Sequence, residues 1–207
     1  MTFGDSNTHG TPPMPVRDSY GRLPAGVRWP TVTDAALGPQ WALIEEGLPG
    51  RTTNRNCPDM GPHMNGQTGL RIALESHGPI DLLVVMLGTN DLQAKFGATA
   101  QMVTGGMASL LSIAHSTEYQ TRHDGFQILM VCPPPVIECG TFGRDFYLGA
   151  SKSADLPMHY AALADTWGVH FLNAGQFIKA SPIDGVHFDA DAHVALGHAI
   201  ADKIATL

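Results

Sequence analysis

The chain has few basic residues, few cysteines, few aromatic residues and no long apolar run. Its 207 residues include 12 Lys and Arg against 19 Asp and Glu, which gives a formal net charge of −7. No run of Lys or Arg is longer than two residues. Because polyanions are held by clustered positive charge, this composition argues against nucleic acid and anionic membranes as partners.

The cysteine count and the short apolar runs set two further limits. Cys57, Cys132 and Cys139 are an odd number, which does not complete a disulfide framework, so we expect reduced thiols. No apolar stretch reaches the ~18 residues of a transmembrane helix, and no secretory signal peptide precedes the first motif described below. These observations favour a cytoplasmic protein. Only Met1–Phe3 stand before that motif, however, so the start of the chain looks clipped.

What is present describes a globular α/β protein. Hydrophobic residues make up 43% and charged residues 15% of the chain, as in ordinary folded domains, and its length predicts a single domain over residues 1–207. Apolar runs of strand length alternate with helical segments, which favours a parallel sheet covered by helices on both faces. Strands are expected at about 2–5, 41–46, 81–87, 126–132 and 168–172, and helices at Trp29–Leu37, Gly66–His77, Thr99–His115, Ser151–Trp167 and Ala190–Ile204.

Two motifs at opposite ends of the chain supply the groups of a nucleophilic triad. The first is Gly4-Asp5-Ser6, and the second is Asp184-x-x-His187. A serine hydroxyl needs an adjacent base to take its proton. A histidine is that base, and a carboxylate sets its tautomer and stabilises its charged form. Since Asp184 and His187 are three residues apart, one loop presents both side chains to one site.

Two further motifs lie between them, each at the end of an apolar or strand-like run. The run that starts at Val84 stops at Gly88-Thr89-Asn90-Asp91, and the segment 45–53 contains Gly50 in a Gly-rich turn. In a parallel sheet the ligand crevice lies outside the carboxyl ends of the strands. The Asn90 side chain and the Gly50 backbone N–H are therefore expected to stabilise a developing oxyanion.

These four blocks, in this order, resemble the SGNH (GDSL-type) hydrolase superfamily. The resemblance implies a flavodoxin-like three-layer sandwich with a five-stranded parallel sheet in the order 2-1-3-4-5. It assigns the nucleophile to Ser6, the base to His187 and its orienting carboxylate to Asp184, with an oxyanion hole of Ser6, Gly50 and Asn90. Five segments look like the bacterial arylesterase and acyltransferase branch: Val27–Pro30, Ile44–Asn54, Ile80–Asp91, Cys132–Pro135 and Asp184–Phe188.

The expected function is hydrolysis of small short-chain (acetyl-type) or aryl esters through an acyl-enzyme, without a cofactor. If an alcohol or peroxide replaced water, the same site would carry out acyl transfer or perhydrolysis. One alternative is a carbohydrate O-deacetylase, which the low aromatic content of 7% makes less favourable. An alternative of another class is a catalytically silent binding or scaffold protein, because a fold does not determine a function.

The loops 10–26, 47–69 and 133–150 follow strand ends and are expected to shape the crevice. The predicted substrate-binding residues are His9, Thr11, Leu48, Phe96 and Val186. The third loop carries three aromatic residues that are expected to be exposed: Phe142, Phe146 and Tyr147. They would either cover the site or fill a subunit interface, and we expect the loop to pack on another subunit of a homo-oligomer.

The remaining candidates have structural interpretations. Asp5 and Asp91 are expected to hold their own turns, and Arg51, Thr52 and Thr53 to support the site. Trp29 and Trp41 are expected in the core. The cluster of His187, Asp189, Asp191 and His193 suggests a metal, but its spacing is not that of a zinc site, and Asp189 and Asp191 are instead typical of a helix start.

Overall fold

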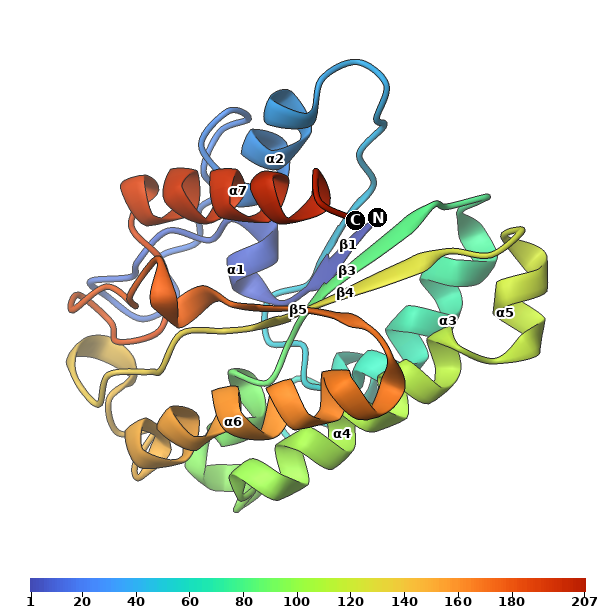
Figure 1. Ribbon diagram of the computed structural model, residues 1–207. Helices are drawn as coiled ribbons and strands as arrows, with labels where there is room; N and C mark the ends of the chain where they lie inside the picture. Colours follow the sequence, from blue (N-terminus) through green and yellow to red (C-terminus); the bar gives the residue numbers. More distant parts are fainter.

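A five-stranded parallel sheet forms the centre of the computed structural model, which describes residues 1–207 (Figure 1). The strands are β1 (Thr2–Gly4), β2 (Glu45–Gly47), β3 (Leu82–Met86), β4 (Gln127–Cys132) and β5 (His170–Asn173). Their order is β2-β1-β3-β4-β5, which confirms the expected topology. Strand β1 therefore has a neighbour on each side, with Thr2 opposite both Glu45 and Val84.

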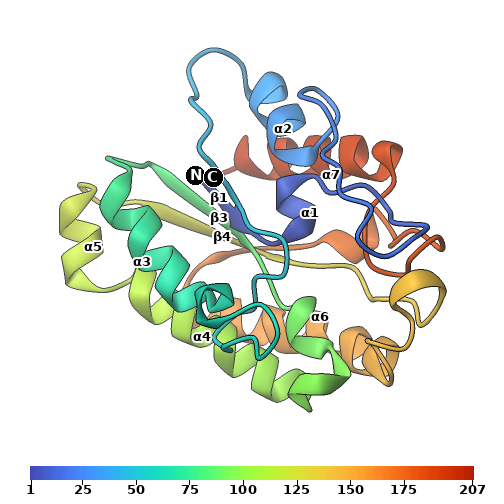
Figure 2. The same cartoon turned by 180° about the vertical axis from the view of Figure 1, so that it is seen from behind.

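Helices cover both faces of the sheet, with α2 and α7 on one face and α3, α4 and α6 on the other (Figures 1 and 2). The helices are α1 (Ser6–His9), α2 (Trp29–Leu37), α3 (Gly66–Ser76), α4 (Ala100–Ala114), α5 (Thr117–Arg122), α6 (Gly149–Trp167) and α7 (Ala190–Ile204). Short 3₁₀ helices are η1 (Pro62–Met64), η2 (Asn90–Leu92), η3 (Ala94–Phe96), η4 (Gly140–Phe142) and η5 (Ala174–Gln176). No helix combines the length and the apolar composition that crossing a membrane requires.

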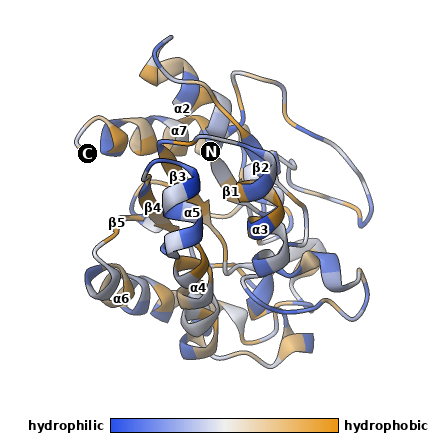
Figure 3. Ribbon diagram, turned by 90° about the vertical axis from the view of Figure 1, so that its right-hand side faces the viewer, coloured by the Kyte–Doolittle hydropathy of each residue, from blue (hydrophilic) through white to orange (hydrophobic).

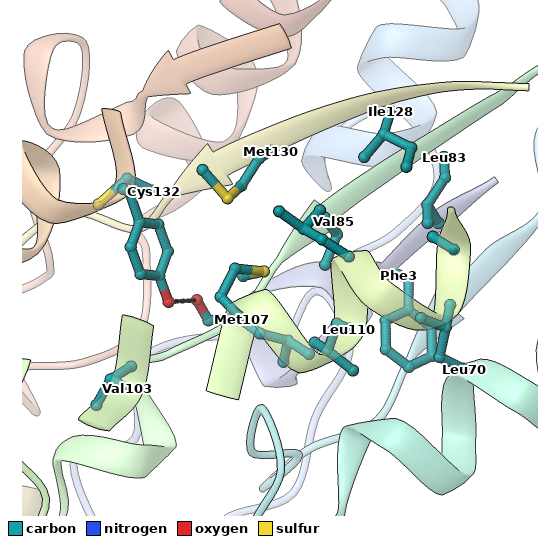
Figure 4. Packing of buried hydrophobic residues seen from close by; sticks show 14 of the residues in the cluster. Phe3, Leu70, Leu83, Val85, Val103, Met107, Leu110, Ile128, Met130 and Cys132 are labelled. Atoms are coloured by element: carbon teal, nitrogen blue, oxygen red, sulfur yellow. Dashed lines mark hydrogen bonds between the residues drawn. The ribbon is translucent and has the colours of Figure 1, made fainter. Parts of the chain in front are cut away.

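The strands are buried on both faces because their successive side chains point in opposite directions. Leu82, Val84 and Met86 of β3 pack with Trp29 of α2 and with the apolar residues of α7. The alternate residues of β3 and β4 belong to the larger core cluster on the other face. In Figure 4, Met107 and Leu110 of α4 lie under Val85 and Met130 of the sheet.

The five expected helices are present, and their observed ends differ from the expected ends by two residues at most. Helix α5 was missed because its sequence, Thr-Glu-Tyr-Gln-Thr-Arg, has no apolar period, and Figure 3 shows it as a mostly hydrophilic helix. Its cap was a usable signal, since the Ser116 side chain accepts a hydrogen bond from the Tyr119 N–H.

The second strand is shorter than expected, and the placement of Trp41 in the core is wrong. Strand β2 begins only at Glu45, and Trp41 lies before it with 36% of its surface exposed. Strand β2 is the edge strand and all three of its residues are half-buried, so this edge of the sheet is less covered than the fully buried β3. Trp29, by contrast, is fully buried as expected.

Candidate active site

Ser6 lies where β1 ends and the single turn of α1 begins. The Asp5 carboxylate caps this turn and accepts a hydrogen bond from the Asn7 N–H at 2.9 Å, as the sequence predicted. The turn closes at Gly10, whose φ of 86° is in the left-handed region. Since Ser6 is the first residue of α1, its backbone N–H has no intrahelical acceptor.

The predicted triad residues are brought together in one hydrogen-bonded line. Ser6 Oγ lies 3.0 Å from His187 Nε2, and His187 Nδ1 lies 2.7 Å from Asp184 Oδ2. All three side chains are buried. Both distances are within the reach that proton transfer from a serine to a histidine requires.

Asp184 is held as an acceptor by several backbone groups as well as by His187. It accepts from the N–H groups of Val186 and His187 at 3.0 Å and from that of Met14 at 2.7 Å. Burial alone raises the pKa of this carboxyl, but these hydrogen bonds and His187 outweigh it and hold the pKa below its usual value. Asp184 is therefore ionised at neutral pH, as the orienting carboxylate of a triad must be.

The predicted oxyanion donors line the same pocket as Ser6. Gly50 has φ +88°, a left-handed conformation, and a Cβ there would clash with Met60. Asn90 is the first residue of η2, which follows β3 after the short connection Leu87–Thr89. Its Nδ2 donates to the Arg51 carbonyl at 3.0 Å and lies 3.3 Å from Asp5 Oδ2.

Two buried carboxylates support this side of the site. Asp91, which was expected to hold its own turn, accepts from Thr53 N at 2.9 Å and from Thr53 Oγ1 at 2.6 Å, so these two partners lie in the other loop. It therefore ties the loop after β3 to the loop after β2. Burial raises the pKa of Asp91 and that of Asp5 to about 6 in each case, because a charge loses hydration there.

Arg51 connects the same loop to the sheet. Its Nη1 donates to the carbonyl of Gly4 at 2.9 Å and to that of Glu46, and its guanidinium lies 4.1 Å from the centre of the Phe3 ring. Burial lowers the pKa of Arg51 to about 10, a value at which the group still carries its charge at neutral pH. These contacts agree with the supporting role expected for Arg51.

A pocket of about 540 Å³ opens over Ser6, Asn90 and His187. Val186 lines it, as predicted, but His9, Thr11, Leu48 and Phe96 do not. His9 Nδ1 instead lies 3.2 Å from Thr11 Oγ1, and the Leu48 N–H continues the sheet by donating to the Gly4 carbonyl. The sequence missed several residues that do line the pocket, among them Met14, Arg17, Met60, Gln93 and Lys95.

The loop 133–150 contributes two aromatic rings to the pocket. Phe142 packs edge-on against the His187 ring with centroids 5.8 Å apart, and the Arg17 guanidinium lies over the Phe142 ring, 5.1 Å from its centre. Phe146, which was expected to be exposed, is 2% exposed and belongs to the core. Only Tyr147 of the three is strongly exposed.

The residues of the candidate metal cluster have other positions. His193 is buried, and its Nδ1 accepts from the Trp29 N–H at 3.3 Å. Burial, with the nearby His187 as a smaller cause, lowers the pKa of His193 to about 4. Asp189 and Asp191 lie at the start of α7, as the sequence indicated. No group of three or more potential ligands is arranged to hold a metal ion.

Comparisons with known proteins agree with this geometry. A model described as the GDSL-like lipase/acylhydrolase family matches residues 2–195. The native aryl esterase of M. smegmatis is 35% identical with a TM-score of 0.94, over 100% of this chain and 97% of that one. Est24, a carbohydrate acetylesterase from Sinorhizobium meliloti, is 39% identical with a TM-score of 0.92, over 99% and 97% of the two chains. No curated protein matches the chain.

Proposed function

The chain belongs to the GDSL-like lipase/acylhydrolase family and is a carboxylic ester hydrolase, and on this premise we propose that it cleaves small esters through an acyl-enzyme on Ser6. The observation that carries the proposal is the line from Ser6 Oγ to His187 Nε2 at 3.0 Å and from His187 Nδ1 to Asp184 at 2.7 Å. The oxyanion donors are then assigned to residues that line the same pocket as Ser6 and His187.

In the acylation step, Ser6 Oγ attacks the ester carbonyl while His187 Nε2 takes the hydroxyl proton. The positive charge that forms on the imidazole is stabilised by the Asp184 carboxylate. His187 then returns the proton to the oxygen of the leaving alcohol, which departs as the acyl-enzyme forms. A water molecule attacks the acyl carbon next, with His187 again as the base, and Ser6 regains its proton.

The oxyanion of each tetrahedral intermediate is stabilised by three donors on the opposite side of Ser6. These are the backbone N–H groups of Ser6 and Gly50 and the Nδ2 group of Asn90. Donors of this kind act on charge that exists mainly in the transition state, so they raise kcat more than they tighten substrate binding. The Asn90 amide already lies within 3.3 Å of Asp5 beside the nucleophile.

The pocket suits a short acyl group and a small leaving alcohol. Its volume of about 540 Å³ is in the range of small-molecule sites, and apolar Met14 and Val186 share its lining with charged Arg17, Asp18 and Lys95. We expect acetyl and butyryl esters to be turned over faster than octanoyl esters. Acyl transfer to an alcohol, or perhydrolysis, needs only that another nucleophile replace water at the acyl-enzyme.

Ser6→Ala, assayed on p-nitrophenyl acetate, tests the proposal. We expect turnover to fall to the background rate, because the residue that forms the covalent bond is gone. Ser109→Ala is the matched control, since Ser109 is half-buried on α4, away from the pocket, and its hydroxyl donates only to the Gly105 carbonyl of the same helix. Undiminished turnover of Ser6→Ala would contradict the proposal.

Deacetylation of a carbohydrate is the second candidate. It is favoured by similarity to two acetylesterases of Sinorhizobium meliloti, at 39% and 34% identity, and by the charged and polar side chains around the pocket. The comparison of kcat/KM for an acetylated xylose with that for p-nitrophenyl acetate distinguishes the candidates. A carbohydrate deacetylase prefers the sugar ester, whereas an aryl esterase prefers the nitrophenyl ester.

We also propose that the loop 133–150 contacts another copy of the chain. Tyr147 and Leu148 are adjacent, apolar and 64% and 51% exposed, and contact with a second copy would remove this surface from water. The Tyr147→Glu variant should then have a smaller mass by light scattering than the parent. Equal masses would contradict the contact.

We also propose a cytoplasmic location for the protein. The three free thiols agree with a reducing compartment of this kind.

A further inference from the structure

The carboxamide of Asn90 is hydrogen-bonded at both of its ends. Its Nδ2 donates to the Arg51 carbonyl at 3.0 Å and lies 3.3 Å from Asp5 Oδ2. Its Oδ1 accepts from Nε2 of Gln93 at 3.0 Å. The Arg51 carbonyl is only an acceptor, so it requires the NH₂ group of Asn90 on its side. The orientation of the Asn90 amide, and with it that of the Gln93 amide, therefore follows from the network.

This orientation matters because an asparagine amide has two opposite ends. If the Asn90 carboxamide turned by 180°, its oxygen would replace its NH₂ group beside Ser6 and would repel an oxyanion. The bond from Gln93 opposes that rotation, because a rotated Asn90 would place two NH₂ groups against each other. It also polarises the amide, since hydrogen bonds in a chain strengthen one another where water is excluded.

Gln93 is well placed to do this. It follows η2, three residues after Asn90, and its own backbone N–H donates to the Asn90 carbonyl at 3.2 Å. The same turn is thus closed once by the backbone and once by the two side chains. Gln93 also lines the pocket. A bound ester therefore displaces water around the Gln93–Asn90 hydrogen bond, and the lower local dielectric strengthens that bond.

We propose that Gln93 is a positioning residue that keeps the NH₂ group of Asn90 aimed at the oxyanion. This proposal rests on the proposed esterase mechanism at Ser6, and it assigns to Gln93 a role that acts through Asn90. In catalysis, one hydrogen of Asn90 Nδ2 stays on the Arg51 carbonyl. The other, which faces Asp5 over the longer distance, goes to the oxyanion.

Two substitutions of Gln93 separate positioning from packing. Gln93→Met keeps the length of the side chain and removes the donor. Gln93→Glu keeps the shape but puts an acceptor against Asn90 Oδ1, which favours the rotated amide. The matched controls are Gln101→Met and Gln101→Glu, because Gln101 is exposed on α4 and bonds only His159. Each substitution is also made in an Asn90→Ala background, and all proteins are assayed on p-nitrophenyl acetate.

The expected result is a loss in kcat that disappears when Asn90 is absent. A neutral hydrogen bond corresponds to a factor of roughly 2 to 10 in a rate, so Gln93→Met should lower kcat by about that factor. Gln93→Glu should lower it further, towards the Asn90→Ala value. KM should change less than about twofold, the thermal unfolding midpoint should match that of the Gln101 controls, and in the Asn90→Ala background neither substitution should lower kcat again.

Several results would overturn the inference. The first is a kcat for both Gln93 variants within about twofold of the parent, and the second is an equal loss in the Asn90→Ala background. A change confined to KM is the third, since it would make Gln93 a substrate contact. If Asn90→Ala itself left kcat unchanged, the oxyanion role of Asn90 would fall together with this inference. If Asn90→Ala lowered kcat and the Gln93 variants did not, only the inference would fail.

Discussion

The two sides of the Ser6 site are built in different ways. On one side, Asp184 and His187 come from a single turn, and Asp184 accepts hydrogen bonds from the N–H groups of that same turn. On the other side, Gly50 and Asn90 come from two loops that the chain separates by 40 residues, and buried side chains join them. The first geometry is local, whereas the second depends on the whole sheet.

The carboxylates of the two sides also differ in electrostatics. The pKa of Asp184 is below its usual value because His187 and three backbone N–H groups stabilise its charge. Burial instead raises the pKa of Asp5 and of Asp91 to about 6. The triad turn thus gains stability from its charge, while the oxyanion side keeps two carboxylates whose charge is costly. We infer that the second side is maintained for its geometry.

We expect the largest effect on activity from a substitution in the turn that carries Asp184 and His187. Asp184→Asn keeps the shape of the side chain but removes the charge that orients His187, and we expect kcat to fall by about 10⁴-fold, as for other triads. Asp189→Asn, at the neighbouring start of α7, is the control and should keep its activity, because its side chain makes no capping bond. A loss below tenfold for Asp184→Asn would show that His187 is oriented by something else.

We expect the next largest effect on the other side of the site, which the loops of Gly50 and Asn90 assemble (the assembled side). Asn90→Ala should lower kcat by ~10²–10³ with a smaller change in KM, since the donor acts on developing charge. Asn56→Ala is a suitable control, because Asn56 is exposed and only accepts from the Asn65 side chain. If steady-state kinetics gave a kcat within threefold of the parent, Asn90 would have only a structural role.

Asp91 tests how the two loops of the assembled side are joined. Asp91→Ala leaves the Thr53 N–H and hydroxyl without their buried acceptor, and the Arg55 guanidinium, 3.7 Å away, without its partner. We expect the free energy of unfolding to fall by roughly 2–5 kcal/mol in a denaturant titration. Asp202→Ala, on the exposed face of α7, should change it by less than about 0.5 kcal/mol. Equal losses for the two variants would contradict the proposed tie between the loops.

The pH dependence of stability tests the electrostatic difference. Because the pKa of Asp5 is about 6 in the folded chain and 3.8 as its ordinary value, the folded state binds more protons between those values. The contribution of Asp5 therefore becomes unfavourable as pH rises from about 4 to 6. Asp5→Asn should gain roughly 1–3 kcal/mol relative to the parent between pH 4 and pH 7. A constant difference across this range would show that Asp5 titrates normally.

The sequence predicted the parts of the molecule that depend on local spacing. The helices followed from apolar periods, and the pairing of Asp184 with His187 followed from their separation by three residues. The order of the strands was implied by the resemblance to a known family. The tie from Asp91 to Thr53 was not predicted, because nothing in the spacing of two loops shows which side chains meet once the sheet forms.

The errors of the sequence analysis have the same origin. His9 and Thr11 were placed in the pocket because they follow Ser6 closely, but the turn of α1 directs them to each other. Trp41 was placed in the core, but it precedes the edge strand β2 and is 36% exposed. Phe146 was expected on the surface because it lies in a loop, but it is buried in the same core cluster as Leu156 and Tyr160 of α6.

The central claim is that Ser6 is the single nucleophile, and its reaction with a fluorophosphonate tests this most directly. Such a reagent phosphonylates a serine that a histidine has activated, and peptide mass spectrometry locates the adduct. The account predicts one equivalent of label, on Ser6, with turnover of p-nitrophenyl acetate lost in proportion, and far slower labelling of Asp184→Asn. Label on another residue, or full turnover after Ser6 is labelled, would contradict it.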